Sequence, residues 1–490
     1  MNKIDLESLF FNISVPENFN LLESQIKIDS RQVVTGDCFF AIQGSSYDSH
    51  KDIESIIESC SYVFSERSAD ELGLNSTEKV IYVDSSRLAL DRVVAWFHRA
   101  SLNKISCIGI TGTNGKTSTA YYIERLLEKS SHPAAVIGTI DHHYKEKVWP
   151  TKLTSPGSKD LYPRVSEMQV AGAKVLVMEV SSHALDQHRC SSVPFELVSF
   201  LNLSQDHLDY HESMEEYYLA KRKLFFLNGY STALVNIDDS YGARLSKDLE
   251  GNNKKQVTFG KSDKADFQFY NIKKSWEKTS FEIDFNGQIK SYETKLLGDF
   301  NLYNLSVAIL TYHYLLGQLP STESLKAIEN VPGRMQKIDT PSGPVFVDYS
   351  HTPDALENAL DFLQSMKKEI SPKSRVICVF GAGGDRDKAK RSKMAEIAEK
   401  YSELVIITSD NPRTENPETI LDDIDLGFSN IAVRKRIENR ASAIQFALQS
   451  MGSGDIVLIA GKGHETYQEI NGRRSFFSDT EEVEKFLQEN

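Results

Sequence analysis

Short apolar runs alternate with longer amphipathic stretches along most of the chain. Between about residues 105 and 330 the short runs are rich in Val, Ile and Leu, and the stretches between them repeat apolar residues at helical spacing. This alternation predicts strands joined by helices, which is the pattern of a parallel α/β sheet. The strands expected in this block are residues 134–137, 175–178, 197–201 and 233–236.

Two further blocks flank this central one and also mix strands with helices. The expected elements are strands 38–42 and 80–83 and a helix around 88–97 in the first block, and strands 345–347, 376–380, 404–408 and 455–460 in the last. In an open α/β sheet, ligands bind outside the carboxyl ends of the strands. We therefore expect ligand-binding loops at those ends in the last block.

The pattern changes between residues 255 and 297. Apolar and polar residues alternate strictly there, as in residues 280–285, and Asn286-Gly287 follows, so we predict an antiparallel hairpin. A helix is expected over residues 301–316, and the segment from Val331 to Met335 is interpreted as an interdomain joint. The prediction is an α/β protein of three domains: 1–102 is small and N-terminal, 103–332 is central and mostly parallel, and 333–490 is Rossmann-like.

A phosphate-binding loop is the most specific motif of the chain. An apolar run ends at Gly112, Thr-Asn-Gly-Lys-Thr follows, and a helix is expected to open at Thr119. Backbone N–H groups at a helix N-terminus bind anions, Lys116 adds positive charge, and the Thr117 hydroxyl is suited to Mg²⁺. The strict pattern has glycine where this chain has Ile110, so the loop is a variant. An ordinary strand–turn–helix corner is the alternative, and the position of the loop favours nucleotide binding.

Further polar groups follow the next two strands. Glu179 comes directly after one strand, where a carboxylate can coordinate Mg²⁺, and residues 202–211 cluster polar and imidazole groups after the other. Zinc is conceivable at this cluster, but cysteines and four-ligand spacing are lacking. Single histidines are more often structural. Lys221 is expected on a helix.

Composition narrows the classes of function. The chain has 490 residues, 40% hydrophobic and 26% charged, and a net charge of −13, which disfavours nucleic acid and anionic membranes as partners. The N-terminus lacks the pattern of a signal peptide, and no apolar run approaches the roughly 20 residues that span a bilayer. Five scattered cysteines are typical of a reducing compartment. We expect a cytoplasmic protein that does not insert into membranes.

Together these motifs resemble the Mur ligases, ATP-dependent enzymes that add amino acids to the peptidoglycan precursor. The resemblance covers nearly the whole chain, and its motifs include Asp29-Ser-Arg31, the phosphate loop, Thr154-Ser-Pro156, Glu179 to Arg189, Asp206-His-Leu-Asp209, Gly298-Asp-Phe-Asn301, Pro332 to Gln336, Asp348 to Pro353, Gly383 to Lys388, Asp410-Asn-Pro-Arg413 and Gly461 to Glu465. It implies a uridine-side domain, an ATPase domain and an amino-acid-binding domain, in chain order.

The resemblance also implies roles for individual residues. ATP would meet Gly112, Thr113, Asn114, Gly115, Lys116, Thr117, Ser118, Asn301, Arg334 and Asp348, with His351 beside them. One Mg²⁺ would be held by Thr117 and Glu179, and a second by His207 and Lys221, the latter as a carbamate, because an unmodified ammonium repels a cation. Lys116, His207 and Lys221 would be catalytic.

The substrates follow from the same resemblance, within the members that add meso-2,6-diaminopimelate. UDP-N-acetylmuramoyl-L-alanyl-D-glutamate would meet Ser30, Thr154, Ser155, Ser181, Gln187 and Arg189. Diaminopimelate would meet Arg386, Asp410, Asn411, Pro412, Arg413, Gly461 and Glu465. Arg413 can pair with the carboxylate that distinguishes diaminopimelate from lysine. We expect a monomer.

Departures from the family pattern fall in the first block. The family usually has Asp-Gly-His where this chain has residues 48–50, and a small-residue pair is less clear at Ser59-Cys60. The alternatives are a lysine-adding Mur ligase, which Arg413 disfavours, and a folylpolyglutamate synthase, which the segment around Ser30 disfavours. A non-catalytic nucleotide-binding protein is a third alternative, and the combined metal residues disfavour it.

Overall fold

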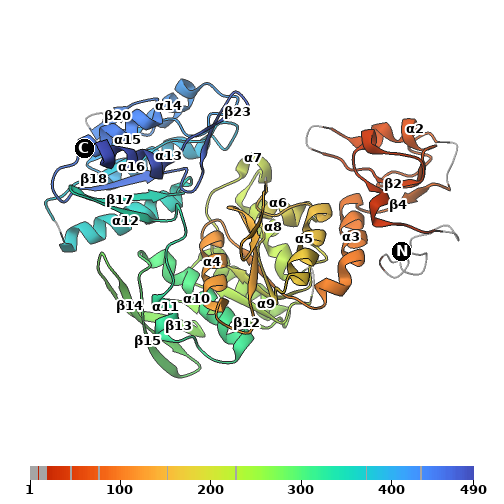
Figure 1. Cartoon of the computed structure of the whole chain (residues 1–490), viewed down its shortest axis with the longest axis horizontal. Helices are drawn as coiled ribbons and strands as arrows, with labels where there is room; N and C mark the ends of the chain where they lie inside the picture. Colours follow the sequence, from red (N-terminus) through yellow and green to blue (C-terminus); the bar gives the residue numbers. More distant parts are fainter. Residues whose placement is uncertain are drawn as a thin grey trace. The chain divides into compact units, whose positions relative to one another are not determined.

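The structure is a computed structural model of the chain and describes Leu9 and residues 19–44, 47–74, 78–151, 153–226, 229–370, 372–430 and 433–489. It consists of two compact units. Unit 1 comprises Met1–Gly109, His132–Val198 and Ala220–Ser231, and unit 2 comprises Ile110–Ser131, Ser199–Leu219 and Thr232–Asn490. Both mix helices with sheets, which confirms the predicted α/β class (Figure 1). The three-domain boundaries stay a prediction.

Unit 1 begins with a parallel sheet in the order β1-β2-β3-β4. Its elements are η1 (Glu23–Gln25), β1 (Ile26–Lys27), η2 (Ser30–Gln32), β2 (Asp37–Phe40), η3 (Ser49–Asp52), α2 (Ile53–Ile56), β3 (Cys60–Ser65), β4 (Val80–Tyr82) and α3 (Ser86–Leu102). Phe39, Val63 and Ile53 are buried together in a small core. The Ser85 hydroxyl caps α3, which extends beyond the predicted helix at both ends.

The rest of unit 1 contains four strands in the order β9-β6-β7-β8, which form one end of an 11-stranded sheet. β6 pairs parallel with β9 and antiparallel with β7. The elements are β6 (Ala134–Ile137), β7 (His142–Tyr144), β8 (Lys147–Trp149), α5 (Ser158–Val170), β9 (Val175–Glu179), α6 (Ser182–Asp186) and η4 (Lys223–Phe225). The strands β5 (Ser106–Thr111) and β10 (Phe195–Phe200) and the helix α8 (Met214–Arg222) contribute residues to both units.

Unit 2 continues the α/β pattern and adds the predicted hairpin. Its first elements are α4 (Lys116–Leu127), α7 (Leu208–His211), β11 (Thr232–Asn236), α9 (Ser240–Gly251), β12 (Gln256–Gly260), β13 (Phe267–Lys274), β14 (Thr279–Phe285), β15 (Gln288–Thr294), α10 (Asp299–Leu316) and α11 (Thr322–Lys326). β13, β14 and β15 are antiparallel. Asn286 and Gly287 both have positive φ, as the tight turn between β14 and β15 requires.

The last part of unit 2 is a six-stranded sheet in the order β16-β17-β21-β18-β19-β20, parallel except for β16. Its elements are β16 (Gln336–Thr340), β17 (Gly343–Asp348), α12 (Pro353–Ile370), β18 (Val376–Phe380), α13 (Ala389–Tyr401), β19 (Leu404–Ile407), α14 (Pro417–Asp425), β20 (Arg434–Arg436), α15 (Arg440–Gln449), β21 (Ile456–Ala460), β22 (Tyr467–Ile470), β23 (Arg473–Phe476) and α16 (Asp479–Glu489).

Two hydrophobic cores cover the two faces of this sheet. One contains residues of α12, α13 and α14, and the other contains residues of α15 and α16. A sheet buried on both faces has nearly continuous apolar strands, which explains why residues 376–380 and 456–460 are readable as strands from sequence. The arrangement is doubly wound, as predicted.

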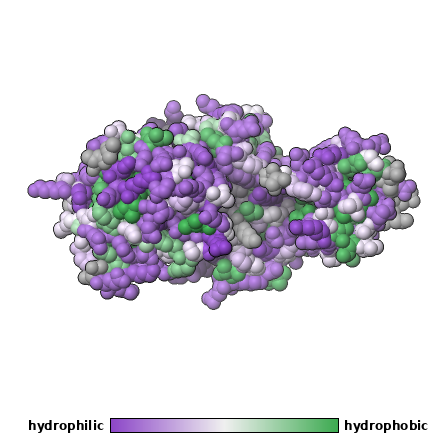
Figure 2. All heavy atoms as spheres, turned by 90° about the horizontal axis from the view of Figure 1, so that it is seen from above, coloured by the Kyte–Doolittle hydropathy of each residue, from purple (hydrophilic) through white to green (hydrophobic). Residues whose placement is uncertain are grey.

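The surface is mainly hydrophilic on the face seen in Figure 2, where hydrophobic residues form small separate patches. Within the part of the chain that the structure describes, no helix is both long and apolar enough to cross a membrane.

Candidate active site

The phosphate loop joins β5 to α4. Gly115 has φ +87° and precedes the first residue of the helix, and a Cβ atom at this position would lie 2.3 Å from Asn304 Oδ1. Glycine is therefore required twice, by backbone conformation and by space. The Lys116 ammonium donates to the carbonyls of Gly112 (2.8 Å) and Thr113 (2.9 Å) and so lies over the loop.

The helix begins three residues earlier than the sequence predicts, at Lys116 rather than Thr119. The left-handed Gly115 lets the chain turn directly into α4, and this places Lys116 and Thr117 in the first turn. A helix N-terminus of this kind favours an anion. Binding of the ATP phosphates by this turn stays a prediction.

α10 packs against α4 through buried amides. Asn301 is 3% exposed; its Nδ2 donates to the Leu297 carbonyl (2.8 Å), and its Oδ1 accepts from the Tyr122 hydroxyl (3.0 Å). The Thr119 hydroxyl donates to Asn304 Oδ1 (3.3 Å). These bonds hold α10 behind the loop, and the role of Asn301 toward adenine stays a prediction.

The segment from Val331 to Met335, which was expected to be an interdomain joint, contains an arginine that contacts the phosphate loop. Arg334 Nη2 donates to the Thr117 hydroxyl (3.2 Å), and the guanidinium lies 4.2 Å from the centre of the Tyr349 ring. Its buried Nε has no hydrogen-bond acceptor among the described residues. Asp348 accepts from the Met335 N–H (2.6 Å), and burial raises the pKa of its carboxyl. Arg334 and Asp348 thus lie where the sequence predicts nucleotide contacts.

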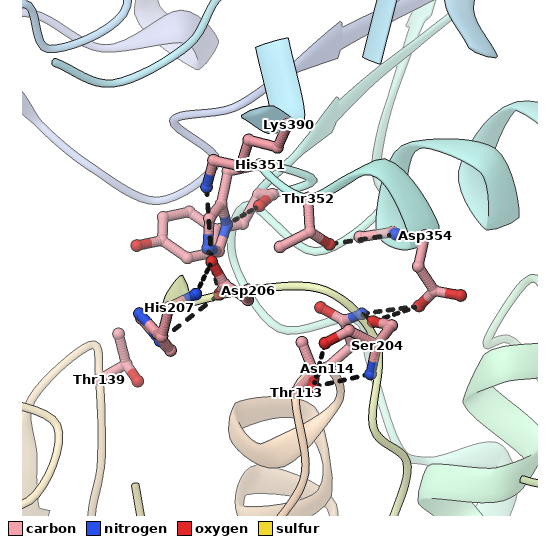
Figure 3. A network of polar contacts seen from close by, with 12 residues as sticks. Thr113, Asn114, Thr139, Ser204, Asp206, His207, His351, Thr352, Asp354 and Lys390 are labelled. Carbon is pink, nitrogen blue, oxygen red and sulfur yellow. Dashed lines mark hydrogen bonds and ion pairs between the residues drawn. The ribbon is translucent and has the colours of Figure 1, made fainter. Parts of the chain in front are cut away.

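Four titratable side chains meet at a second point of unit 2 (Figure 3). Asp206 lies 3.5 Å from Lys390 Nζ, 3.4 Å from His207 Nε2 and 3.8 Å from His351 Nε2. Burial opposes ionisation of Asp206, but these neighbours outweigh it and hold its pKa well below the usual range. Burial and Lys390 lower the pKa of His351 to about 4, so this imidazole is neutral near pH 7.

The phosphate loop also contacts α12 (Figure 3). Asp354 Oδ2 accepts from the Asn114 amide (2.8 Å) and from the Ser204 hydroxyl (3.3 Å). Asn114 is therefore oriented by a residue 240 positions away in the sequence.

In unit 1, Glu179 ends β9 and is fully buried. Its two carboxylate oxygens accept from the Thr139 N–H (2.8 Å) and the Thr139 hydroxyl (3.0 Å). The Thr139 hydroxyl is also 3.1 Å from that of Thr154. The Ser155 hydroxyl reaches the Glu179 carbonyl (2.8 Å) and the Ser181 hydroxyl (3.2 Å). The predicted residues Thr154, Ser155, Glu179 and Ser181 thus form one hydrogen-bonded group.

Arg189 joins this group. Its guanidinium donates to Gln187 Oε1 (2.6 Å) and to the Ser155 carbonyl (3.2 Å). Ser30 lies in the first sheet's region, where its hydroxyl donates to Asp52 (2.7 Å). Lys221 is 1% exposed on α8. Its carbamylation stays a prediction.

The predicted amino-acid site lies at the carboxyl ends of β18, β19 and β21. Arg413 has φ +54°; its Nη1 donates to the Gly384 carbonyl (2.6 Å), and its backbone N–H donates to the Glu469 carbonyl (3.0 Å). Arg391, fully buried, binds Glu415 and the Gly383 carbonyl (3.1 Å). These bonds interlock the loops that follow β18 and β19 and fix the Arg413 guanidinium between them.

The other predicted residues of this site differ in exposure. Arg386 is exposed, whereas Asp410, Asn411, Pro412 and Gly461 are buried. Glu465 accepts from the Asn411 amide (2.7 Å) and from Lys462 Nζ (3.2 Å), a fully buried cation. Burial and Asp410 raise the pKa of Glu465; burial opposes ionisation of Asp410, but Lys462 and Arg440 outweigh it and lower its pKa. Glu465 therefore already has a cationic partner.

Sequence reasoning missed several residues of these clusters: Thr139, Asp354, Lys390 and Lys462. Thr139 could have been found by position, because it follows the strand over residues 134–137 at the same edge as Glu179. Asp354 lies one residue beyond the motif Asp348 to Pro353, and Lys390 lies two residues beyond the motif Gly383 to Lys388. No local pattern indicates what these two side chains contact.

The comparisons with known proteins agree with this geometry. Residues 110–312 match the family described as Mur ligase middle domain, and residues 333–463 match the Mur ligase, glutamate ligase domain. These matches together span more than half of the chain, which therefore belongs to the Mur ligase family.

Individual relatives are similar over nearly their whole length. A protein of Aquifex aeolicus (strain VF5) named UDP-N-acetylmuramoyl-L-alanyl-D-glutamate--2,6-diaminopimelate ligase is 41% identical over 464 residues, which cover 94% of this chain and 93% of that protein. A solved structure of a ligase with the same name has a TM-score of 0.68 at 31% identity and covers 99% of this chain and 98% of its own. Folylpolyglutamate synthase of Mycobacterium tuberculosis shares the fold, with a TM-score of 0.62 at 15% identity over 76% of this chain and 92% of its own.

Proposed function

We propose that the protein is an ATP-dependent, ADP-forming ligase that joins meso-2,6-diaminopimelate to the D-glutamate of UDP-N-acetylmuramoyl-L-alanyl-D-glutamate, in peptidoglycan precursor synthesis. The names of the relatives support the reaction. The observation that carries the choice of amino acid is Arg413, whose guanidinium is fixed at the carboxyl ends of β18 and β19. A planar cation held in place suits bidentate pairing with the distal carboxylate of diaminopimelate.

The reaction must activate a poor acyl donor. The γ-carboxylate attacks the γ-phosphorus of ATP, an acyl phosphate forms and ADP leaves; the amine then attacks the carbonyl carbon, and phosphate leaves from the tetrahedral intermediate. Positioning and charge neutralisation are the main tasks of the protein in such chemistry. Lys116 and the first turn of α4 bind the β- and γ-phosphates, and Arg334 approaches the same turn. Exclusion of water protects the acyl phosphate from hydrolysis.

Mg²⁺ belongs to this proposal as the ion that neutralises phosphate charge. The described residues contain no cluster of three or more His, Cys, Asp or Glu side chains that forms a metal cage. Mg²⁺ in nucleotide sites needs only one or two carboxylates and takes oxygens from the phosphates and water. Of the proposed ligands Thr117, Glu179, His207 and a carbamate on Lys221, Glu179 and the carbamate are the carboxylate-type oxygen ligands that such a site needs.

In the amino-acid site we assign the distal carboxylate to Arg413, with the exposed Arg386 as a second cation. Asn411 and Glu465 would face the ammonium of the substrate. Lys462 already pairs with Glu465, so the charge available to an incoming ammonium comes from Glu465 and Asp410 together. The same reaction with L-lysine is the second candidate, and it leaves Arg413 without a carboxylate partner.

The test is release of ADP that depends on both the muramoyl dipeptide and an amino acid, measured with a panel of amino acids. Diaminopimelate is expected to give the highest kcat/KM. ATP hydrolysis that ignores the dipeptide would contradict the ligase assignment, and a preference for lysine would contradict the substrate alone. We further propose a cytoplasmic monomer, which sedimentation of the purified protein tests.

A further inference from the structure

A carboxylate of α3 is buried next to the residues assigned to the muramoyl dipeptide. Asp91 is fully buried; Oδ1 accepts from the Tyr162 hydroxyl (2.6 Å) and the Ser158 hydroxyl (3.0 Å), and Oδ2 accepts from the Ser192 N–H (2.7 Å). All of these residues belong to unit 1. Asp91 therefore connects three segments: α3, the start of α5 and the loop after α6.

This carboxylate has no ion pair in the described part of the chain: its hydrogen-bond donors there include the hydroxyls of Ser158 and Tyr162 and the Ser192 N–H. Burial raises its pKa to about 6, and hydrogen bonds from Tyr162, Ser192 and Ser158 oppose that shift. An unpaired carboxylate is expensive to bury. Both of its oxygens accept hydrogen bonds here, which a side chain with a single acceptor could not do.

The same contacts lead to Arg189. The Ser158 hydroxyl lies 3.2 Å from the Arg189 carbonyl as well as 3.0 Å from Asp91. Asp91 thus holds the segment 189–192 directly at Ser192, and Ser158 shares its single hydroxyl proton between Asp91 and the Arg189 carbonyl. The preceding residue, His188, has φ +52°, so the chain turns sharply just before this segment. The guanidinium of Arg189 leaves this fixed backbone toward Gln187 and the Ser155 carbonyl.

We propose that Asp91 is a positioning residue for the muramoyl dipeptide: it fixes the backbone of residues 189–192 so that Arg189, Gln187 and Ser155 form one preorganised binding group. The inference rests on the proposed function, which places the dipeptide at these residues. Asp91 itself acts only through the loop. Its loss is therefore expected to weaken binding of the dipeptide and to leave the phosphate loop and the amino-acid site unchanged.

Asp91→Ala is the sharpest variant because it removes both acceptor oxygens. Asparagine would be a weaker test, since its NH₂ group can donate to the hydroxyls of Tyr162 and Ser158, which rotate and accept, while its Oδ1 keeps the Ser192 N–H. Ser158→Ala is the milder second variant, since it removes the hydroxyl that lies near the Arg189 carbonyl and leaves Asp91 bonded to Tyr162 and Ser192. The control is Asp266→Ala, which removes the acceptor of the Thr258 N–H and hydroxyl at an exposed position of unit 2.

Two measurements test the proposal. Amide hydrogen exchange of the protein alone is expected to accelerate about tenfold over residues 187–193 in Asp91→Ala, and to stay at the wild-type rate in Asp266→Ala, since one buried hydrogen bond corresponds to about tenfold in an equilibrium. In the ligase assay, KM for the muramoyl dipeptide is expected to rise about tenfold in Asp91→Ala and about threefold in Ser158→Ala. KM for ATP and kcat are expected to stay within twofold.

The outcomes separate the two proposals. Unchanged exchange over residues 187–193 in both variants overturns the positioning role, whatever the enzyme does. Parallel losses in kcat and in both KM values overturn it too, because they indicate general destabilisation. Accelerated exchange in a protein whose wild type does not bind the muramoyl dipeptide contradicts the proposed function and leaves the loop-fixing role of Asp91 standing.

Discussion

Arg413 offers the most decisive test of substrate choice. Its guanidinium is anchored on one side by the Gly384 carbonyl, which leaves the other N–H groups for a carboxylate. A charge-assisted, bidentate pair contributes on the order of 3 kcal/mol, which is roughly a hundredfold in kcat/KM. Arg413→Ala is therefore expected to lower kcat/KM for diaminopimelate by about a hundredfold and to change that for L-lysine by less than about threefold.

Backbone strain does not confuse this experiment. Arg413 has φ +54°, and alanine, like arginine, carries a Cβ atom, so the backbone strain is the same in both proteins. Arg413→Lys keeps the charge and loses the planar pairing, and an intermediate loss of about tenfold is expected. The assay is ADP release at saturating ATP and muramoyl dipeptide, with each amino acid varied. Equal damage to both amino acids, or a wild type that prefers lysine, would refute the reasoning on specificity.

Four other predictions follow from the site. Lys116→Ala is expected to abolish product formation, because the phosphates lose their main cation; near-normal turnover in a coupled ADP assay would contradict the assignment. Lys221→Ala is expected to be nearly inactive and partly rescued by short carboxylates, whereas rescue by amines would identify the free lysine as the working species. Gly115→Ala is expected to weaken ATP binding by at least tenfold in calorimetry, since its Cβ would lie 2.3 Å from Asn304 Oδ1 at φ +87°. Burial, helped by Arg164, lowers the pKa of His142 to about 4, so the unfolded chain binds more protons than the folded protein between about pH 6.5 and pH 4. The free energy of unfolding is therefore expected to fall with acidification across that window by up to about 1.4 kcal/mol per pH unit. Denaturant titrations of His142→Gln, which lacks the titrating group, are expected to show a shallower dependence of this free energy on pH.

Local sequence patterns were sufficient to predict most helices and strands and the loop between β5 and α4. Residues 376–380 form a strand within the predicted bounds because both faces of the last sheet are buried, and Asn286-Gly287 forms the expected turn because both residues tolerate positive φ. The start of α4 was predicted three residues late, since periodicity locates a helix better than the glycine that opens it. Hydrogen-bond partners that lie far apart in the sequence could not be predicted: Asn114 and Asp354 are 240 positions apart, and Asp91 and Ser192 are 101 positions apart.

Charge pairs inside the amino-acid site were equally unpredictable. Glu465 could be proposed for an ammonium from its residue type, but its pairing with Lys462 depends on how the loop after β21 folds back beside Asn411. Sequence thus indicated which residues gather at the strand ends, and the structure shows which of their charges are already balanced.

The interlocked loops around Arg413 have a consequence for redesign of the enzyme. The backbone of Arg413 is bonded to the β22–β23 hairpin at Glu469 and Asn471, and its side chain is bonded to the loop after β18. Exchange of this one side chain would remove the proposed selector and leave the backbone bonds to the hairpin in place. A laboratory route to a different amino acid would have to transplant both loops and the hairpin as one cassette, and libraries confined to single positions would mainly yield poorer versions of the present catalyst.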